Sequence, residues 1–203
     1  NGMSAGKIAM AISPSLAKKS VVAKVNGVLV DLDKPINEDS ELELVLKESS
    51  EAYAVLNHSC SHLLASAIHK LYPKAMFGVG PNIEEGFYYD INPGEGITIT
   101  EADFSKIEKE MQRLVAADLK FERKEVSKEE ALKMFANDKY KTELINELPE
   151  GEIISVYTDG DYSDFCRGPH VPSTKYLKNF KLLAVSGAYW RGDSKNEQLQ
   201  RIY

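Results

Sequence analysis

The segment from Glu51 to Leu71 constrains the fold most, because its apolar residues recur at the spacing of one helix face. These apolar positions are Leu56, Cys60, Leu63, Leu64, Ala67 and Leu71. Pro73 lacks a backbone N–H and ends the pattern. We therefore expect a helix of about six turns, with one stripe packed against a core and Cys60 as a core residue.

Three of the four histidines lie in the same segment. At about 100° per residue, His58, His62 and His69 fall together on the helix face opposite the apolar stripe. Their separation from the stripe excludes an ordinary place in the core. Two alternatives are left, an exposed polar face or a shared functional site.

The first 48 residues predict a small α/β unit. It is expected to contain one helix and three strands, at Gly6–Ile12, Val21–Val25, Val28–Leu32 and Glu41–Leu46. The first two strands flank Asn26-Gly27, the strongest short hairpin signal, since both turn positions require positive φ. The unit has few apolar residues with which to build a core of its own.

The rest of the chain mixes strands and helices without regular alternation. Strands are expected at Phe77–Val79, Phe87–Ile91, Phe121–Val126, Ile153–Thr158 and Lys181–Val185. Further helices are expected at 104–115, 131–135 and 140–148, with capping boxes at Thr100 and Ser127 before the first two. Residues 159–164 and 186–193 are expected to form loops. This order favours an α+β fold with an antiparallel sheet over a doubly wound fold.

Composition narrows the class of protein. The chain is 43% apolar and 28% charged, and no apolar run approaches the roughly 20 residues that cross a bilayer. Because no signal peptide is evident, we expect a cytoplasmic protein with no membrane partner and with Cys60 and Cys166 as thiols. The net charge of −6 argues against gripping nucleic acid by bulk electrostatics, so any RNA contact is expected to be local.

Two short pairs carry the candidate chemistry, His58 with His62 and Cys166 with His170. Residues four apart on a helix project from adjacent turns, so the first pair can converge on one point. A turn made rigid by Pro169 can aim the second pair at the same point. Three imidazoles and a thiolate could form a tetrahedral zinc site or a pocket of proton-transfer groups. An H-x-x-x-H pair is common by chance, but the second pair favours a shared site.

Three other residues are weaker candidates, each with an ordinary alternative. Asp164 lies two residues before Cys166, so an extended chain would point both to one side, although a turn-capping role is commoner for such an Asp. Lys141 lies on a polar helix, where solvent exposure is usual. Tyr89 is expected to pack in the core unless its hydroxyl reaches a pocket.

Four blocks of sequence resemble, in order and spacing, the N-terminal half of bacterial threonyl-tRNA synthetases. They are HSCSHLL at 58–64, GPNIEEGFYYD at 80–90, DFCRGPHVP at 164–172 and GAYWRGDS at 187–194. The resemblance covers essentially the whole chain. It implies a partial, ubiquitin-like TGS domain at residues 1–48, without that domain's first hairpin, and an editing domain shared with alanyl-tRNA synthetases at residues 49–203.

The resemblance also implies a function and its site. In this family the editing domain hydrolyses the ester of serine wrongly attached to tRNA(Thr). The implied catalytic residues are His58, His62, Lys141, Cys166 and His170. The implied substrate-binding residues are Tyr89 and Asp164, with Asp164 gripping the serine amino group.

Cofactors and partners follow from the same resemblance. Editing requires no cofactor, and zinc at His58, His62, Cys166 and His170 is the alternative. ATP and a catalytic zinc belong to a class II aminoacylation core, into which the family continues after a region like this one and through which the full-length enzyme is expected to form a homodimer. The expected partners are mischarged tRNA(Thr) and the remainder of the synthetase.

Two rival interpretations remain open. The first is a noncatalytic tRNA-binding module stabilised by zinc, which would unfold when a chelator removes the metal. The second is a free-standing aminoacyl-tRNA deacylase of the kind that alanyl-type relatives provide. The TGS-like beginning and the block at 187–194 favour the threonyl family over the second alternative.

Overall fold

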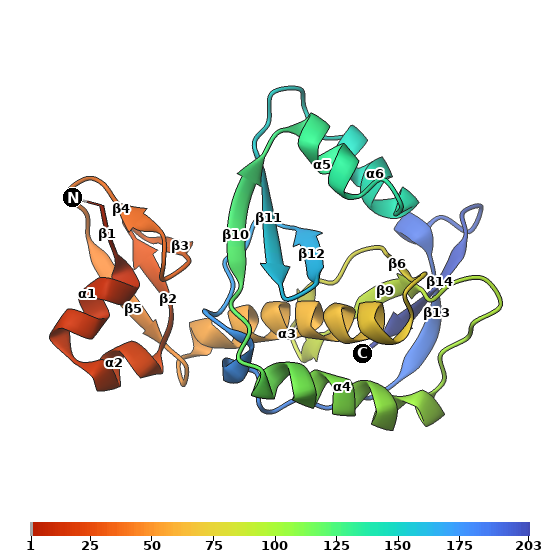
Figure 1. Ribbon diagram of the computed structural model, residues 1–203, viewed down its shortest axis with the longest axis horizontal. Coiled ribbons are helices and arrows are strands. Elements are labelled where there is room, and N and C mark those ends of the chain that lie inside the picture. The colour runs from red at the N-terminus through yellow and green to blue at the C-terminus, as the bar shows by residue number, and fades with distance from the viewer. Residues whose placement is uncertain (1) are drawn as a thin grey trace.

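The computed structural model describes residues 2–203 and has two lobes of unequal size (Figure 1). The smaller lobe contains the N-terminal unit, and the larger lobe is built around one long helix. All strand pairings in the described residues are antiparallel. The predicted α+β class with antiparallel sheets is therefore confirmed.

The N-terminal unit contains two short helices and two small sheets. Its elements are β1 (Met3–Ser4), α1 (Ala5–Ile12), α2 (Pro14–Lys19), β2 (Ser20–Val25), β3 (Val28–Val30), β4 (Pro35–Ile36) and β5 (Leu42–Leu46). The strand order is β3-β2-β5, with β1 and β4 paired separately. Asn26 and Gly27 both have positive φ, which confirms the predicted hairpin turn. The unit's own apolar cluster is small and centres on Ala5, Ala23 and Leu32.

Helix α3 (Ser50–Leu71) is the axis of the larger lobe. The Ser49 side chain caps its first turn by accepting the Ala52 N–H, and Pro73 follows its end. The boundary predicted between residues 48 and 49 falls in the turn between β5 and α3, and the domain division itself stays a prediction. Every residue from 59 to 68 is buried, so the polar face of this helix is covered as well as its apolar face.

The elements around α3 form a four-stranded sheet, a three-stranded sheet, a two-stranded sheet of β7 and β8, and three further α-helices. They are β6 (Met76–Phe77), β7 (Asn82–Ile83), β8 (Gly86–Phe87), β9 (Tyr89–Asn92), α4 (Phe104–Ala116), β10 (Glu122–Val126), α5 (Lys128–Met134), α6 (Lys139–Asn146), β11 (Ile154–Asp159), β12 (Tyr162–Phe165), β13 (Val185–Tyr189) and β14 (Gln198–Ile202). The larger sheet has the order β13-β14-β9-β6, and the smaller one the order β10-β11-β12. Helix α4 packs along α3, while α5 and α6 stand over the far end of the small sheet.

Three local predictions were wrong. A loop was expected at residues 159–164, but residues 162–165 form strand β12. Strands β11 and β12 make a tight hairpin around Gly160, whose φ is positive. The last part of the chain forms the hairpin of β13 and β14, whereas a strand was expected at Lys181–Val185 and a loop at 186–193. Helix α2 was missed as well. It begins at Pro14, a favoured first-turn residue, with Ser13 as its N-cap.

Most of the core belongs to one cluster around α3. It contains Leu63, Leu64 and Ile68 from that helix and Ile107 and Met111 from α4. Within residues 2–203, no helix is long and apolar enough to cross a membrane. Cys60 and Cys166 are both free thiols, and Cys60 is buried in the core as predicted.

Candidate active site

Helix α3 and the loop after β12 bring four candidate residues together. The rings of His58 and His62, one turn apart, have centroids 5.0 Å from each other. The ring of His170 stacks on that of His58 at 4.6 Å and meets that of His62 edge-on at 4.3 Å. With the Cys166 thiol, these residues offer four ligand atoms that all lie within 4.8 Å of one another.

His170 is held from several sides. Its Nδ1 lies 2.9 Å from the Ser59 hydroxyl, which also accepts the Val171 N–H at 3.1 Å. Its Nε2 lies 3.2 Å from Cys166 Sγ, and its ring stacks on Phe121 with centroids 4.9 Å apart. The imidazole therefore has a fixed position and faces both the thiol and the helix histidines.

Residues 166–171 reach this position because Gly168 allows a close approach. Its φ is +66°, and a Cβ at this position would collide with the Tyr157 hydroxyl. Pro169 follows it through a cis peptide bond. The Tyr157 ring meets the His170 ring edge-on at 4.5 Å. The Gly-Pro pair thus lets β11 support the imidazole directly.

A second group of buried polar residues adjoins the histidines. Lys141 Nζ lies 2.6 Å from Asp164 Oδ1 and donates to Tyr89 Oη at 2.8 Å and to the Gly78 carbonyl at 2.9 Å. Asp164 Oδ2 accepts hydrogen bonds from the hydroxyls of Tyr89 and Tyr162, the latter at 3.1 Å. Lys141 is 4% exposed, so the solvated alternative considered for it is wrong.

Local structure explains how Lys141 comes to point inward. It lies in the first turn of α6, whose N-cap Asp138 accepts the N–H groups of Tyr140 and Lys141. The other carboxylate oxygen of Asp138 accepts the Phe77 N–H at 2.6 Å, which fastens this turn to β6. Gly80 leaves room for the Tyr89 ring, with which any Cβ there would collide. The hydroxyl of Tyr89 therefore reaches the pocket from the core.

His62 joins the two groups. Its Nε2 lies 3.8 Å from Asp164 Oδ2, and the side chain is almost completely buried. Its Nδ1 has no hydrogen-bond partner among residues 2–203. A buried ring nitrogen of this kind is a natural contact for a water molecule, a metal ion or a substrate atom.

Burial sets the protonation of the groups around the histidines. It lowers the pKa of His58, His62 and His170, and the neighbouring imidazoles lower those of His62 and His170 further. These rings are therefore neutral near pH 7 and able to accept a proton or bind a metal. Burial, followed by the Asp164 charge, raises the pKa of Cys166 and keeps its thiol protonated.

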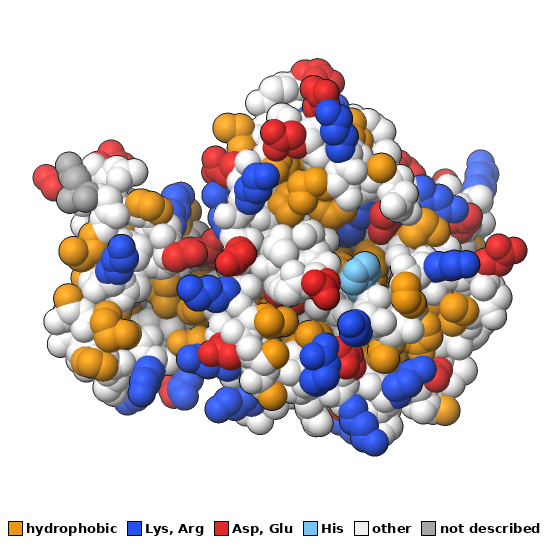
Figure 2. Space-filling view, viewed as in Figure 1, with side chains coloured by type: hydrophobic (Ala, Val, Ile, Leu, Met, Phe, Trp, Pro, Cys, Tyr) orange, Lys and Arg blue, Asp and Glu red, His pale blue; other side chains and the backbone are white. Residues whose placement is uncertain are grey.

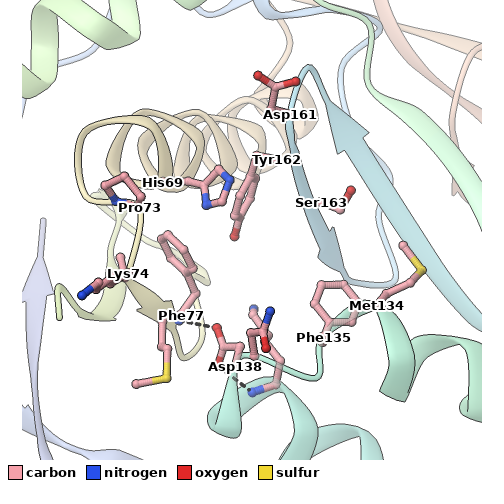
Figure 3. A pocket seen from close by; sticks show the side chains of 14 residues that line it. His69, Pro73, Lys74, Phe77, Met134, Phe135, Asp138, Asp161, Tyr162 and Ser163 are labelled. Carbon is pink, nitrogen blue, oxygen red and sulfur yellow. Dashed lines mark hydrogen bonds between the residues drawn. The ribbon is translucent and has the colours of Figure 1, made fainter.

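A cleft of about 640 Å³ opens beside this pocket (Figure 3). His69 and Tyr162 line one side of it and Phe135 another, while Lys141 also contributes to its lining. The cleft lies between the end of α3 and the helix pair α5 and α6. In Figure 2 a histidine is visible in the hollow beneath these two helices. Acidic and basic side chains are interspersed over this face, without a large basic patch.

All seven residues singled out in the sequence fall into these two adjoining groups. His69, on the same helix face, lies apart, against Phe77 and Tyr162. Four further residues around the site, Ser59, Phe121, Tyr157 and Tyr162, were not predicted from the sequence. Tyr162 had a signal, because it lies two residues before Asp164 and so shares its strand face. The other three are packing partners that only the tertiary structure reveals.

Two protein-family models match the chain. Residues 1–46 match the TGS domain, and residues 154–203 match the threonyl and alanyl tRNA synthetase second additional domain. The threonine–tRNA ligase of Enterococcus faecalis (strain ATCC 700802 / V583) is 52% identical over 203 residues, which are 100% of this chain and 31% of that protein. The threonine–tRNA ligase of Staphylococcus aureus (strain JH9) is 52% identical over 202 residues, again 100% of this chain and 31% of that protein.

The two ends of the chain are thus similar to these two domain families. The resemblance to the N-terminal TGS and editing region of threonyl-tRNA synthetases, predicted from four sequence blocks, is thereby confirmed. The chain spans about a third of the length of the curated relatives it matches.

Proposed function

We propose that this chain is the editing part of a threonine–tRNA ligase and hydrolyses the ester of serine mischarged onto tRNA(Thr). The observation that supports it most is the group of neutral, largely buried imidazoles beside the Lys141–Asp164 pair. Similarity to threonine–tRNA ligases and the second-additional-domain match support the same role.

A synthetase needs such an activity because a binding pocket alone discriminates poorly between serine and threonine. Serine lacks one methyl group of threonine, and a pocket gains only about 1–3 kcal/mol from such a group. A synthetase therefore needs a second site that hydrolyses the smaller product. In our proposal the walls of this pocket admit serine and reject the additional methyl group of threonine.

The reaction is a water attack on the ester carbonyl. His58 or His62 takes a proton from the water as its oxygen bonds to the carbonyl carbon, since both rings are neutral. The bond between the carbonyl carbon and the ribose oxygen then breaks, and the proton passes to that oxygen. The products are serine and tRNA with a free terminal hydroxyl. Lys141 stabilises the negative charge that develops on the ester.

Asp164 and Tyr89 hold Lys141 in place. The negative charge of Asp164 also attracts the serine ammonium group, which would replace one of the hydroxyls now bound to this carboxylate. The protonated thiol of Cys166 makes it a poor nucleophile, so we favour water attack over an acyl-enzyme. We assign Cys166 and His170 to the pocket wall that faces the ester.

The three histidines and the cysteine of the pocket also suit zinc. Three imidazole nitrogens and one sulfur are a ligand set that zinc accepts, and the free Nδ1 of His62 fits such a role. His58, His62, Cys166 and His170 would hold the ion, which would supply Lewis-acid polarisation or structural cross-linking. This donor set is the observation that favours the second candidate function, a zinc-stabilised tRNA-binding module.

The proposed substrate and partners of this chain are those expected of the longer threonine–tRNA ligases to which it is similar. We propose that mischarged tRNA(Thr) is the substrate and that its 3′ end enters through the cleft beside Lys141. The remainder of a synthetase, acting as a cytoplasmic homodimer, would anchor most of the tRNA. ATP and a catalytic zinc would belong to its aminoacylation core, and editing itself requires no cofactor.

The decisive experiment is deacylation of separately prepared Ser-tRNA(Thr) and Thr-tRNA(Thr) by this chain, with and without a chelator. We expect selective loss of serine that the chelator does not change. Ser-tRNA(Ala), which is alanine tRNA mischarged with serine, serves as a third substrate, and a preference for it would favour a deacylase of the alanyl type. If neither Ser-tRNA(Thr) nor Thr-tRNA(Thr) is deacylated, and if the protein carries stoichiometric zinc and unfolds when a chelator removes it, the zinc-stabilised binding module is the correct function instead.

A further inference from the structure

One carboxylate of the N-terminal unit reaches the loop that carries His170. Asp31 Oδ1 accepts the His170 backbone N–H at 2.9 Å, and its Oδ2 accepts the Tyr157 hydroxyl at 2.6 Å. Asp31 is 9% exposed, although it lies 139 positions before His170 in the chain. A side chain from one unit thus supports both the backbone of His170 and the Tyr157 ring, which packs against the His170 imidazole.

Asp31 has a fixed place in its own unit. It follows β3 directly, and its carbonyl accepts the Lys34 N–H at 3.2 Å in a turn. The next residue, Leu32, belongs to the small apolar cluster, and its carbonyl accepts the Gly6 N–H at 2.8 Å. The carboxylate therefore projects from a well-packed turn.

The two units also share apolar packing. Val21, Val22 and Val45 of the N-terminal unit belong to the same cluster as Ala52 and Val55 of α3. This packing places the N-terminal unit beside the start of α3 and the lower part of β10 (Figure 1). Asp31 can hold the loop in place only while the two units keep this packing.

We infer that Asp31 is a positioning residue of the editing site, so that the TGS-type unit completes the pocket of the other domain. The inference rests on the proposed function. Asp31 sets the position of His170 between the rings of His58 and Phe121, and it touches no reacting atom. Its loss would leave the His170 N–H and the Tyr157 hydroxyl buried without partners, so the loop would shift to find others.

The test uses the intact chain with Asp31→Ala, Asp31→Asn and Tyr157→Phe. Asp33→Asn is the matched control, because Asp33 lies two residues away and is exposed. We expect Asp31→Ala to lower kcat for Ser-tRNA(Thr) about 10- to 100-fold with little change in KM, the result of moving a pocket group by about 1 Å. Asn retains an acceptor for the His170 N–H, so Asp31→Asn should recover part of the rate. The control should equal the wild type.

A second readout does not depend on activity. Alkylation of Cys166 reports on the loop, because its sulfur contacts His170, and buried Cys60 in α3 reports on global opening in the same sample. We expect Asp31→Ala to speed alkylation of Cys166 severalfold and to leave Cys60 unchanged. Faster alkylation of both thiols, or of neither, would overturn the inference.

The two readouts separate the possible failures. If the wild type has no deacylase activity, the proposed function fails, while the alkylation pattern still decides whether Asp31 positions the loop. If Asp31→Ala retains full kcat and only lowers the melting temperature, the residue is merely structural and the inference is wrong.

Discussion

The histidine half of the pocket is half-buried to buried and the Lys141–Asp164 half is buried, but they meet the cost of burial in different ways. The histidines stay neutral, since burial lowers the pKa of all three. Lys141 and Asp164 instead form an ion pair and surround it with hydroxyl and carbonyl groups. The comparison indicates that one half is suited to moving a proton and the other to holding a charge in place.

The largest expected effect on activity comes from removing the neutral imidazoles of helix α3. Replacing His58 and His62 together with Ala should lower the rate of serine deacylation about 10²- to 10⁴-fold, the usual contribution of a general base. Single-turnover deacylation measures the loss. Asn57→Ala is the control, because Asn57 neighbours His58 and bonds back along the helix to the Tyr53 carbonyl. Full activity in the double variant would exclude these histidines from the chemistry.

Removing one charge tests the ionic half. Lys141→Ala should destabilise the fold by about 3–5 kcal/mol, because it leaves the buried Asp164 carboxylate without its cation. Urea denaturation gives the free energy of unfolding. Lys139→Ala, which removes an exposed ion pair from the same helix, should cost at most about 1 kcal/mol. The double change Lys141→Met with Asp164→Leu should regain much of the loss, and a cost as large as the single change would contradict this account.

The hydrogen bonds of Ser59 offer a smaller test of the neutral half. Ser59→Ala should cost about 1–3 kcal/mol, because the Val171 N–H and a ring nitrogen of His170 would be buried without partners. Thermal unfolding measures the change. Ser61→Ala, on the same helix, removes contacts to the carbonyls of His58 and Gly80 and serves as a comparison outside the His170 loop. Only Ser59→Ala is expected to speed hydrogen exchange at residues 167–171.

The pH dependence of stability offers the finest test of the histidine half. The pKa of His62 is lowered in the folded state, so below about pH 6.5 the unfolded chain binds the additional proton and the fold loses about 1.4 kcal/mol per pH unit. Asp159, whose pKa is raised by burial, acts in the opposite direction. His62→Asn isolates the histidine, since it removes only that dependence.

Urea denaturation at pH 7.5 and 5.5, with chelator present, measures this difference. The wild type should lose more stability between the two pH values than His62→Asn does. An equal loss in both proteins would mean that His62 titrates alike in the folded and unfolded states.

Much of this pocket could be predicted from local spacing, and the remainder depended on tertiary contacts. Helix α3 and its paired histidines follow from periodicity, and the Asn26-Gly27 hairpin follows from turn chemistry. The burial of Lys141 could not be predicted, since only the packing of α6 against β6 turns an ordinary lysine inward. The hairpin of β13 and β14 was missed for a similar reason, because mostly half-exposed and exposed strands with a central Gly187 lack the usual alternation.

The complete burial of residues 59–68 has a consequence for how this region tolerates change. Most helices in small domains have a solvent-facing side on which substitutions accumulate at little cost. The middle of α3 has none, because its apolar side builds the core and its polar side forms the pocket. In a library of random single substitutions, the middle of α3 should therefore lose folding on one side and activity on the other, leaving almost no silent positions.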